Sequence, residues 1–236
     1  MENYIKNTIY QGREELYENL VSLSKSLQNI TLSKHPILME FIGSCRSGKT
    51  TSIALIQDIL IKHGVKVLVI DEEYIKLTKE INHNRDKKMN IDSLGYTNQV
   101  IEEKILGYDA TYNQNYDFII YDRGINDEFV WLNVFDAPKN SLTEYTEKLN
   151  TRKVDFLFVL ICTSKTTLER KYLNSLSIMP SKWTNEETLT KYLASLNSSK
   201  VYFKKHSANI FEVDTTNISP VSASLKICHY LISKLK

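Results

Sequence analysis

The sequence predicts an α/β protein, in which a five-stranded parallel sheet has helices on both faces. Five short runs are apolar at nearly every position, as expected for strands that are buried on both sides. Helical patterns separate these runs along the chain, which is the order of elements in α/β folds. A glycine-containing stretch also connects the first apolar run directly to a helical pattern. Together these observations predict a three-layer architecture.

The predicted strands occupy residues 37–42, 65–71, 117–122, 154–162 and 209–215. The predicted helices cover residues 50–64, most of 74–114 and 219–236. The first of these helices ends at Gly64, because glycine commonly follows the last turn of a helix.

The region before the first strand is predicted to be a separate helical extension, residues 1–35. Leucine and isoleucine recur there at helical spacing, at Leu16, Leu20, Leu23, Leu27 and Ile30. Residues 36–236 contain no internal repeat or long linker and are predicted to form one domain.

Composition limits the classes of function. The chain has 236 residues, 42% of them hydrophobic and 25% charged, with a net charge of +2. So small a charge gives no general reason to bind nucleic acid or an anionic membrane. The longest apolar run, residues 156–162, is too short to span a bilayer. The three cysteines are far apart and suggest neither zinc nor disulfides. We therefore expect a cytoplasmic protein.

The stretch from Gly43 to Thr50 matches the phosphate-binding pattern G-x-x-x-x-G-K-[ST]. Glycine permits the tight turn after the strand and lets main-chain N–H groups approach phosphate oxygens. The N-terminus of the following helix attracts an anion. In this pattern Lys49 contacts the β- and γ-phosphates and the Thr50 hydroxyl binds Mg²⁺. The predicted nucleotide-binding residues of this segment are Gly43, Ser44, Cys45, Arg46, Ser47, Gly48, Lys49, Thr50 and Thr51.

Acidic side chains follow two other predicted strands. Asp71, Glu72 and Glu73 come after the second strand, and Asp122 and Arg123 come after the third. Ligands of open parallel sheets bind at the carboxyl ends of the strands. Asp122 is therefore predicted to help hold Mg²⁺. Arg123 is predicted to contact the transferred phosphoryl group or the acceptor, or else to form a salt bridge with the acidic cluster. One of the three carboxylates after strand two, with Asp71 and Glu73 favoured, is predicted to be the general base.

With these motifs, the chain resembles P-loop kinases of the deoxynucleoside kinase and thymidylate kinase type. The resemblance covers roughly residues 36–236, although only the glycine stretch is a specific match. The segment "FLFVLICTSKTTLERKYLNS" is similar to the family's fourth strand and the helix that opens its lid, here about residues 165–190. The segment "NIFEVDTTNISPVSASLKIC" is similar to its last strand, base-contacting turn and C-terminal helix.

This resemblance implies further site residues. Arg170 and Lys171 stand where the cationic lid begins, and a lid arginine would stabilise charge on the transferred phosphoryl group. Asp214 and Thr215 stand in the turn beside the adenine. The sequence departs from the family at Lys165-Thr166, in a lid without a run of arginines, and in "INDEFVW" after "DRG". These departures leave the acceptor open.

The expected function is an ATP- and Mg²⁺-dependent phosphotransferase acting on a small molecule, with a nucleoside or nucleotide favoured. Residues 74–115 would form the acceptor wall, and the aromatic side chains Phe129 and Trp131 either line the same cleft or belong to the core. Two alternatives remain: a regulatory NTPase that switches a protein partner, or a kinase of another hydroxyl compound or of an RNA end. The oligomeric state is open, and a homodimer is one alternative.

One further segment, "KVYFKKH" at residues 200–206, mixes aromatic and basic side chains. Such mixtures occur in proteins that bind single-stranded nucleic acid. With a nearly neutral chain, a solvated helix face is the favoured interpretation.

Overall fold

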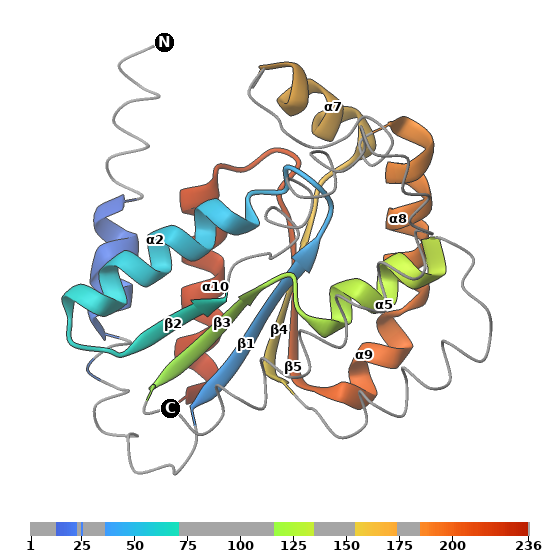
Figure 1. Cartoon of the computed structure of the whole chain (residues 1–236). Helices are drawn as coiled ribbons and strands as arrows, with labels where there is room; N and C mark the ends of the chain where they lie inside the picture. The colour runs from blue at the N-terminus through green and yellow to red at the C-terminus, as the bar shows by residue number, and fades with distance from the viewer. Residues whose placement is uncertain are drawn as a thin grey trace, which may run out of the picture.

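The computed structural model describes residues 13–22, 25, 36–70, 116–134, 154–173 and 185–235. The five described strands form one parallel sheet in the order β2-β3-β1-β4-β5 (Figure 1). The prediction of a five-stranded parallel sheet is thus confirmed. The strands are β1 (Ile37–Gly43), β2 (Val67–Ile70), β3 (Phe118–Asp122), β4 (Val154–Ile161) and β5 (Ser207–Asp214).

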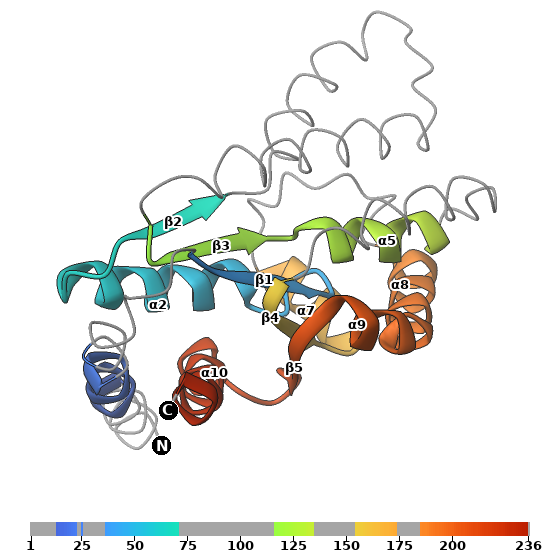
Figure 2. The same cartoon turned by 90° about the horizontal axis from the view of Figure 1, so that it is seen from below.

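Helices cover both faces of this sheet. Helices α2 (Lys49–Lys62) and α10 (Pro220–Leu235) pack against one face. Helices α5 (Ile125–Val134), α8 (Glu186–Ser198) and α9 (Lys200–His206) pack against the other. Figures 1 and 2 show the two groups on opposite sides of the strands. Helix α7 (Ser164–Leu173) follows β4 and lies near the end of the sheet at which β1 ends (Figure 1).

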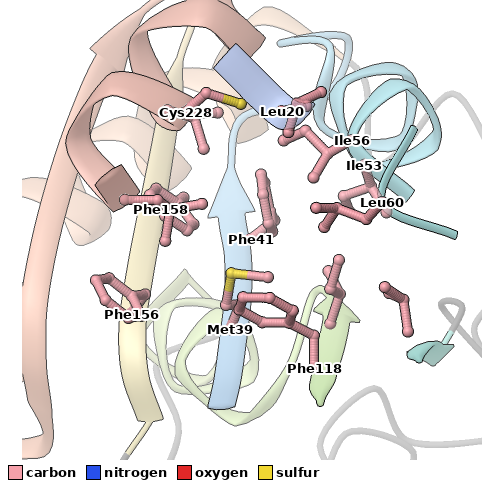
Figure 3. Packing of buried hydrophobic residues seen from close by; sticks show 14 of the residues in the cluster. Leu20, Met39, Phe41, Ile53, Ile56, Leu60, Phe118, Phe156, Phe158 and Cys228 are labelled. Carbon is pink, nitrogen blue, oxygen red and sulfur yellow. The ribbon is translucent and has the colours of Figure 1, made fainter. Parts of the chain in front are cut away.

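The core on the α2 side is built from alternate residues of the central strands. Met39 and Phe41 of β1 and Phe158 of β4 are fully buried there, and the rings of Phe41 and Phe158 have centroids 4.9 Å apart. Figure 3 shows Phe41 on the side of Ile53 and Ile56 of α2, and Phe158 on the side of Cys228 of α10. This packing fixes α2, and therefore the loop that precedes it, against β1.

The helical segment 13–22 belongs to the same core. Leu16 and Leu20 are buried in the cluster formed with α2 and α10. Tyr17 also makes a hydrogen bond of 3.1 Å with His63, just after α2. The described part of the predicted extension is therefore packed on the core, and the remainder of it lies outside the described residues.

The strand order determines where a ligand can bind. From β1 the chain crosses to β2 on one side, and from β3 it crosses past β1 to β4 on the other. In an open α/β sheet, such a reversal leaves a crevice beyond the carboxyl ends of the strands concerned. Gly43 and Asp122 end β1 and β3 at this position. Among the described helices, none is long and apolar enough to cross a membrane.

Candidate functional site

The loop of residues 43–48, called here the glycine loop, turns the chain from β1 into α2. Gly43 has a φ of 134°, and a Cβ atom on it would lie 1.9 Å from the carbonyl oxygen of Leu160 in β4. Gly48, the residue before α2, has a φ of 90°. The loop therefore needs a glycine at each end, for contact with the neighbouring strand at Gly43 and for the left-handed backbone at Gly48.

Side chains around the glycine loop hold it in place. The Ser44 hydroxyl accepts a hydrogen bond of 2.9 Å from the Cys162 main-chain N–H and donates one of 3.2 Å to the Cys162 carbonyl oxygen. The Thr167 hydroxyl of α7 donates to the carbonyl oxygen of Cys45, at 3.2 Å. The loop is thus anchored to the end of β4 and to the helix after it.

The N-terminus of α2 is open to an anion. Gly48 has no side chain to cap the helix, and the first turn contains no acidic residue. The first hydrogen bond of the helix runs from Ser52 N–H to Gly48 O, at 2.9 Å. The amides before it have no acceptor within the helix and point out of its positive end.

Lys49 lies over the glycine loop. Its ammonium group donates to the carbonyl oxygens of Gly43 and Ser44, both at 2.9 Å, and contacts the Ser47 hydroxyl at 3.5 Å. The side chain is only 5% exposed. Burial, followed by the nearby charge of Arg123, lowers the pKa of Lys49 below its usual 10.5. The hydrogen bonds of this buried ammonium to described residues all go to neutral oxygens, so that it can exchange them for a charged partner.

Asp122 meets the helix at Thr50. The Thr50 hydroxyl donates a hydrogen bond of 2.5 Å to Asp122 Oδ2, although the two residues are 72 positions apart in the sequence. Asp122 is 5% exposed, and its other oxygen, Oδ1, is buried without a hydrogen-bond partner among the described groups. The structure therefore brings together the two residues that the sequence predicted as magnesium ligands.

Arg123 has an unusual backbone conformation. Its φ is 64°, in the left-handed region, and its main-chain N–H donates to the Phe41 carbonyl oxygen at 2.9 Å. Within the described residues, the other non-glycine residue with positive φ is Arg46 in the glycine loop. Such strain costs roughly 1–3 kcal/mol and gathers at functional sites. The guanidinium group of Arg123 is buried, with one nitrogen 3.5 Å from Cys45 Sγ.

The Arg123 guanidinium forms an ion pair with Asp127, a carboxylate that was not predicted as a site residue. Asp127 of α5 is fully buried, and its Oδ2 lies 3.7 Å from the Arg123 guanidinium. It also accepts a short hydrogen bond from the Tyr192 hydroxyl of α8 and one of 3.2 Å from the Trp131 indole. Among the described residues, Arg123 thus has an acidic partner in α5, whereas the predicted cluster at residues 71–73 lies outside the described part of the chain.

Glu40 is a second buried carboxylate that sequence reasoning missed. It lies in the middle of β1 and is fully buried. It accepts hydrogen bonds from both the main-chain and the side-chain nitrogen of Asn126, at 2.8 and 2.7 Å, and from the Asp127 N–H at 3.2 Å. Glu40 therefore caps the N-terminus of α5 from the neighbouring strand. The signal in the sequence was a lone charge inside an otherwise apolar strand.

The hydrogen bond from Tyr192 to Asp127 leads to a prediction about stability. We expect Tyr192→Phe to lower the free energy of unfolding by about 1.5–3 kcal/mol, because a buried charge loses a donor. Burial and, next, the charge of Asp127 raise the pKa of Tyr192. The stabilisation of the fold by the Tyr192 hydroxyl is therefore fully present below pH 10, the usual tyrosine pKa. It decreases above that pH, because tyrosine ionises more readily in the unfolded chain. Urea unfolding at pH 8 and at pH 10.5 measures both effects.

Tyr230→Phe is the control for this experiment. The Tyr230 hydroxyl donates a long bond of 3.4 Å to the carbonyl oxygen of Ile210. We expect a loss of less than about 1 kcal/mol for an uncharged acceptor. Equal losses of unfolding free energy in the two variants would show that the hydrogen bond from Tyr192 does not stabilise the buried Asp127 carboxylate.

Arg170 connects the glycine loop to the turn after β5. Its guanidinium donates to the carbonyl oxygens of Arg46 at 2.9 Å, Thr215 at 2.6 Å and Thr216 at 3.3 Å. The family resemblance implied that Arg170 is a lid residue that reaches the transferred phosphoryl group. In the structure this side chain instead donates hydrogen bonds to three main-chain oxygens. It therefore fixes the glycine loop relative to the turn after β5.

The turn after β5 lies beside the glycine loop because of this arrangement. Asp214 accepts a hydrogen bond of 2.8 Å from the Thr216 N–H. The Thr216 side chain and, next, this main-chain bond lower the pKa of the Asp214 carboxyl. Thr215 donates to the Ile161 carbonyl oxygen through both its N–H, at 2.7 Å, and its hydroxyl, at 3.0 Å. Both predicted residues therefore shape the turn itself.

No family model matches this chain, and no curated protein matches it either. The assignment of a function consequently depends on the geometry of the site.

Several predicted residues lie outside the described part of the chain. They are Asp71, Glu72 and Glu73, the acceptor wall at residues 74–115, and residues 174–184 of the predicted lid. Lys171 belongs to α7, but its side chain is also outside the description. Phe129 stacks on Tyr202 at 4.0 Å and Trp131 packs against Tyr192 at 4.7 Å between ring centroids. Of the two interpretations of these aromatics, the structure favours core residues.

The assembled site combines a helix end that is suited to an anion with two side-chain oxygens that are suited to a metal ion. Uncapped amides and Lys49 face the glycine loop, and Thr50 and Asp122 lie beside each other at the start of α2. Mg²⁺ commonly takes only one or two protein ligands and completes its shell with water and phosphate. The buried, unpartnered Asp122 Oδ1 fits such an ion and its water. No group of three or more ligating side chains occurs in the described segments.

Proposed function

We propose that this protein is a P-loop kinase, which transfers the γ-phosphate of ATP to a small molecule with the help of Mg²⁺. The contact that carries this proposal is the hydrogen bond from Thr50, in the first turn of α2, to Asp122. The glycine loop supplies the phosphate cradle and Thr50 and Asp122 supply the ligands. A helix end alone would suit any anion, but this combination suits a nucleotide with its metal.

Each residue has a defined part in this proposal. The amides at the start of α2 and the ammonium of Lys49 bind the phosphate chain and neutralise charge as it develops. Lys49 would exchange its bonds with Gly43 and Ser44 for phosphate oxygens. Mg²⁺, when bound, supplies electrostatic stabilisation of the phosphates, with Thr50 and Asp122 holding it. Arg123, held by Asp127, projects its guanidinium beside the glycine loop, where a transferred phosphoryl group would lie.

A nucleoside or nucleotide is the first acceptor class to test. The sequence resemblance described above supports it, as does the arrangement of the turn at 214–216 beside the glycine loop, where a base could lie against main-chain groups. The regulatory alternative gains no support from the described N-terminal helix, because Leu16 and Leu20 bury its apolar side in the core.

The deciding experiment measures ADP release from MgATP with nucleosides, nucleoside monophosphates and non-nucleoside hydroxyl compounds, with Lys49→Ala as the blank. We expect one class of acceptor to raise ADP release well above the basal rate and to become phosphorylated. Nucleotide binding with an unchanged basal rate for every acceptor would contradict the kinase proposal and favour the regulatory NTPase. Failure of MgATP to bind would contradict the nucleotide site itself.

A separate prediction concerns the affinity of the proposed site for Mg²⁺. Asp122→Asn keeps the size of the side chain but removes its charge, and we expect the apparent affinity for Mg²⁺ in the reaction to fall about 10- to 100-fold. Titration of activity against Mg²⁺ at saturating ATP measures this change. Asp117→Asn, at the other end of the same strand segment, is the control, because Asp117 instead accepts a hydrogen bond from the Lys66 N–H. If both variants give the same Mg²⁺ dependence, Asp122 is not part of the metal site.

A further inference from the structure

Helix α7 contacts the glycine loop through two side chains. The helix lies near the end of the sheet at which β1 runs into this loop (Figure 1). The Thr167 hydroxyl donates a hydrogen bond of 3.2 Å to the carbonyl oxygen of Cys45. The Arg170 guanidinium donates one of 2.9 Å to the carbonyl oxygen of the next residue, Arg46. Two consecutive carbonyl groups of the loop are therefore bonded to the same helix.

These two bonds also set the direction of two main-chain amides. In a planar trans peptide, the carbonyl group and the N–H group of the following residue point in opposite directions. The described part of the chain has no cis peptide bond. Because the carbonyl of Cys45 points to α7, the N–H of Arg46 points away from that helix. The carbonyl of Arg46 directs the N–H of Ser47 in the same manner.

The hydrogen bond of the Ser47 N–H shows which space this amide faces. It is a long bond of 3.3 Å, made across the loop to the carbonyl oxygen of Ser44. The Lys49 ammonium donates to the same oxygen, at 2.9 Å. The Ser47 N–H and the Lys49 ammonium therefore converge on one side of the loop, where the proposed function places the phosphate chain.

The peptide that Arg170 holds has an unfavourable conformation. Arg46 has a φ of 59°, in the left-handed region that residues other than glycine rarely adopt. Arg170 bonds to the carbonyl of this residue, while its other main-chain bonds go to Thr215 and Thr216 in the turn after β5. Strand β5 is paired with β4 along its length. The guanidinium is thus anchored to the sheet and can keep the strained peptide in place.

We propose that Thr167 and Arg170 are positioning residues of the nucleotide site, which orient the amides of the glycine loop toward the phosphate chain. Neither side chain contacts phosphate in this arrangement. Arg170 acts through the loop, and not as a lid arginine on the transferred phosphoryl group. This inference rests on the proposed function, because it concerns the same site.

Three ligands separate this role from a direct contact. MgATP has a base and a full phosphate chain, MgADP lacks the transferred phosphate, and magnesium tripolyphosphate lacks the nucleoside. Loss of a positioning residue should weaken the binding of all three by a similar factor. Loss of a contact to the transferred phosphate would leave MgADP binding unchanged. Loss of a contact to the base would leave tripolyphosphate binding unchanged.

The test is isothermal titration calorimetry of the full-length protein with each ligand. We expect Arg170→Met, which removes the donors and keeps an unbranched side chain, to raise all three dissociation constants about 10-fold. Thr167→Val removes one hydrogen bond and keeps the shape, and should raise all three about threefold. The stoichiometry of binding should not change. A variant that is only less folded would bind less ligand per chain with the same dissociation constant.

Lys165→Met is the matched control variant, because it removes the same charge from an exposed position earlier on α7. It should bind all three ligands as the unchanged protein does. Thr167→Val alone decides the question if Arg170→Met does not fold.

Three results would overturn the inference. They are unchanged binding of MgADP or tripolyphosphate by Arg170→Met, unchanged binding of all three ligands by Thr167→Val, and equal effects of Lys165→Met and Arg170→Met. If the unchanged protein binds none of the ligands, the proposed function itself is wrong and the inference is wrong with it.

Discussion

Gly43→Ala is expected to lower the free energy of unfolding by more than about 4 kcal/mol, which is a large part of the total stability of a domain. The added Cβ atom would lie 1.9 Å from the Leu160 carbonyl oxygen and 2.7 Å from its carbonyl carbon. Both atoms belong to the backbone of β4, which is hydrogen-bonded to strands on either side. The obstacle therefore cannot move as a side chain would. Urea unfolding without nucleotide, or the yield of soluble protein, measures this effect.

Gly48→Ala provides the comparison within the same loop. A Cβ atom on Gly48 would make ordinary contacts, the nearest at 3.7 Å to Pro220, but the residue would retain a φ of 90°. We expect a loss of about 1–2 kcal/mol from the left-handed backbone alone. If Gly43→Ala proves no more destabilising than Gly48→Ala, the close approach of β1 and β4 at Gly43 is not the reason for the glycine.

Lys49→Met is expected to remove the stabilisation of the protein by MgATP. Ligand at 100 times its dissociation constant stabilises a folded protein by about 2.7 kcal/mol. Methionine has a similar length to lysine but no charge, so it fills the space over the glycine loop without binding phosphate. Unfolding in urea with and without MgATP measures the difference. Lys62→Met, which removes an exposed lysine from the other end of α2, should retain the full effect.

Without nucleotide, the free energy of unfolding of Lys49→Met should depend on pH differently from that of the unchanged protein. Because folding lowers the pKa of Lys49, the unfolded chain binds more protons than the folded protein between that lowered pKa and 10.5. The stability of the unchanged protein must therefore rise with pH in this window, relative to Lys49→Met. A stability difference that stays constant between pH 7 and pH 10.5 would show that the ammonium of Lys49 is not disfavoured in the fold.

The strands were predictable because each is apolar over its whole length. Residues 37–42 and 154–162 were predicted as strands and correspond closely to β1 and β4. These are central strands with neighbours and helices on all sides, so nearly every position must be apolar. Helices α8 and α9 were expected only as filling between strands, since their polar, exposed faces make their ends indistinct in the sequence.

The position of Asp122 was predictable for a similar reason. A polar residue at the end of a buried strand marks the edge of the sheet, and the parallel arrangement then places it near the loop after β1. The glycine spacing predicted the turn and the helix from Lys49 onward. What the spacing could not predict is the contact between Thr50 and Asp122, since it depends on β3 lying directly beside β1.

The contacts that Asp127, Tyr192 and Arg170 make around the site were not predictable. Asp127 was part of "INDEFVW", a segment noted only for differing from the resembling family, and Tyr192 is one of 14 tyrosines in the chain. Nothing local in either segment indicates a bond across 65 positions. Arg170 was expected at a lid, whereas its guanidinium meets main-chain oxygens of two loops, which carry no sequence signal because every residue has a carbonyl group.

By itself, the sequence determined the parallel α/β class, the glycine loop and the chemical types of the residues that follow β1 and β3. These features depend on periodicity, strand-end polarity and glycine spacing, all of which are local along the chain. Only the tertiary structure decided that Thr50 and Asp122 contact each other directly, that Asp127 pairs with Arg123, and that Arg170 joins two loops. Such contacts depend on the order and register of strands and on helix packing, where residues far apart in sequence come within hydrogen-bonding distance.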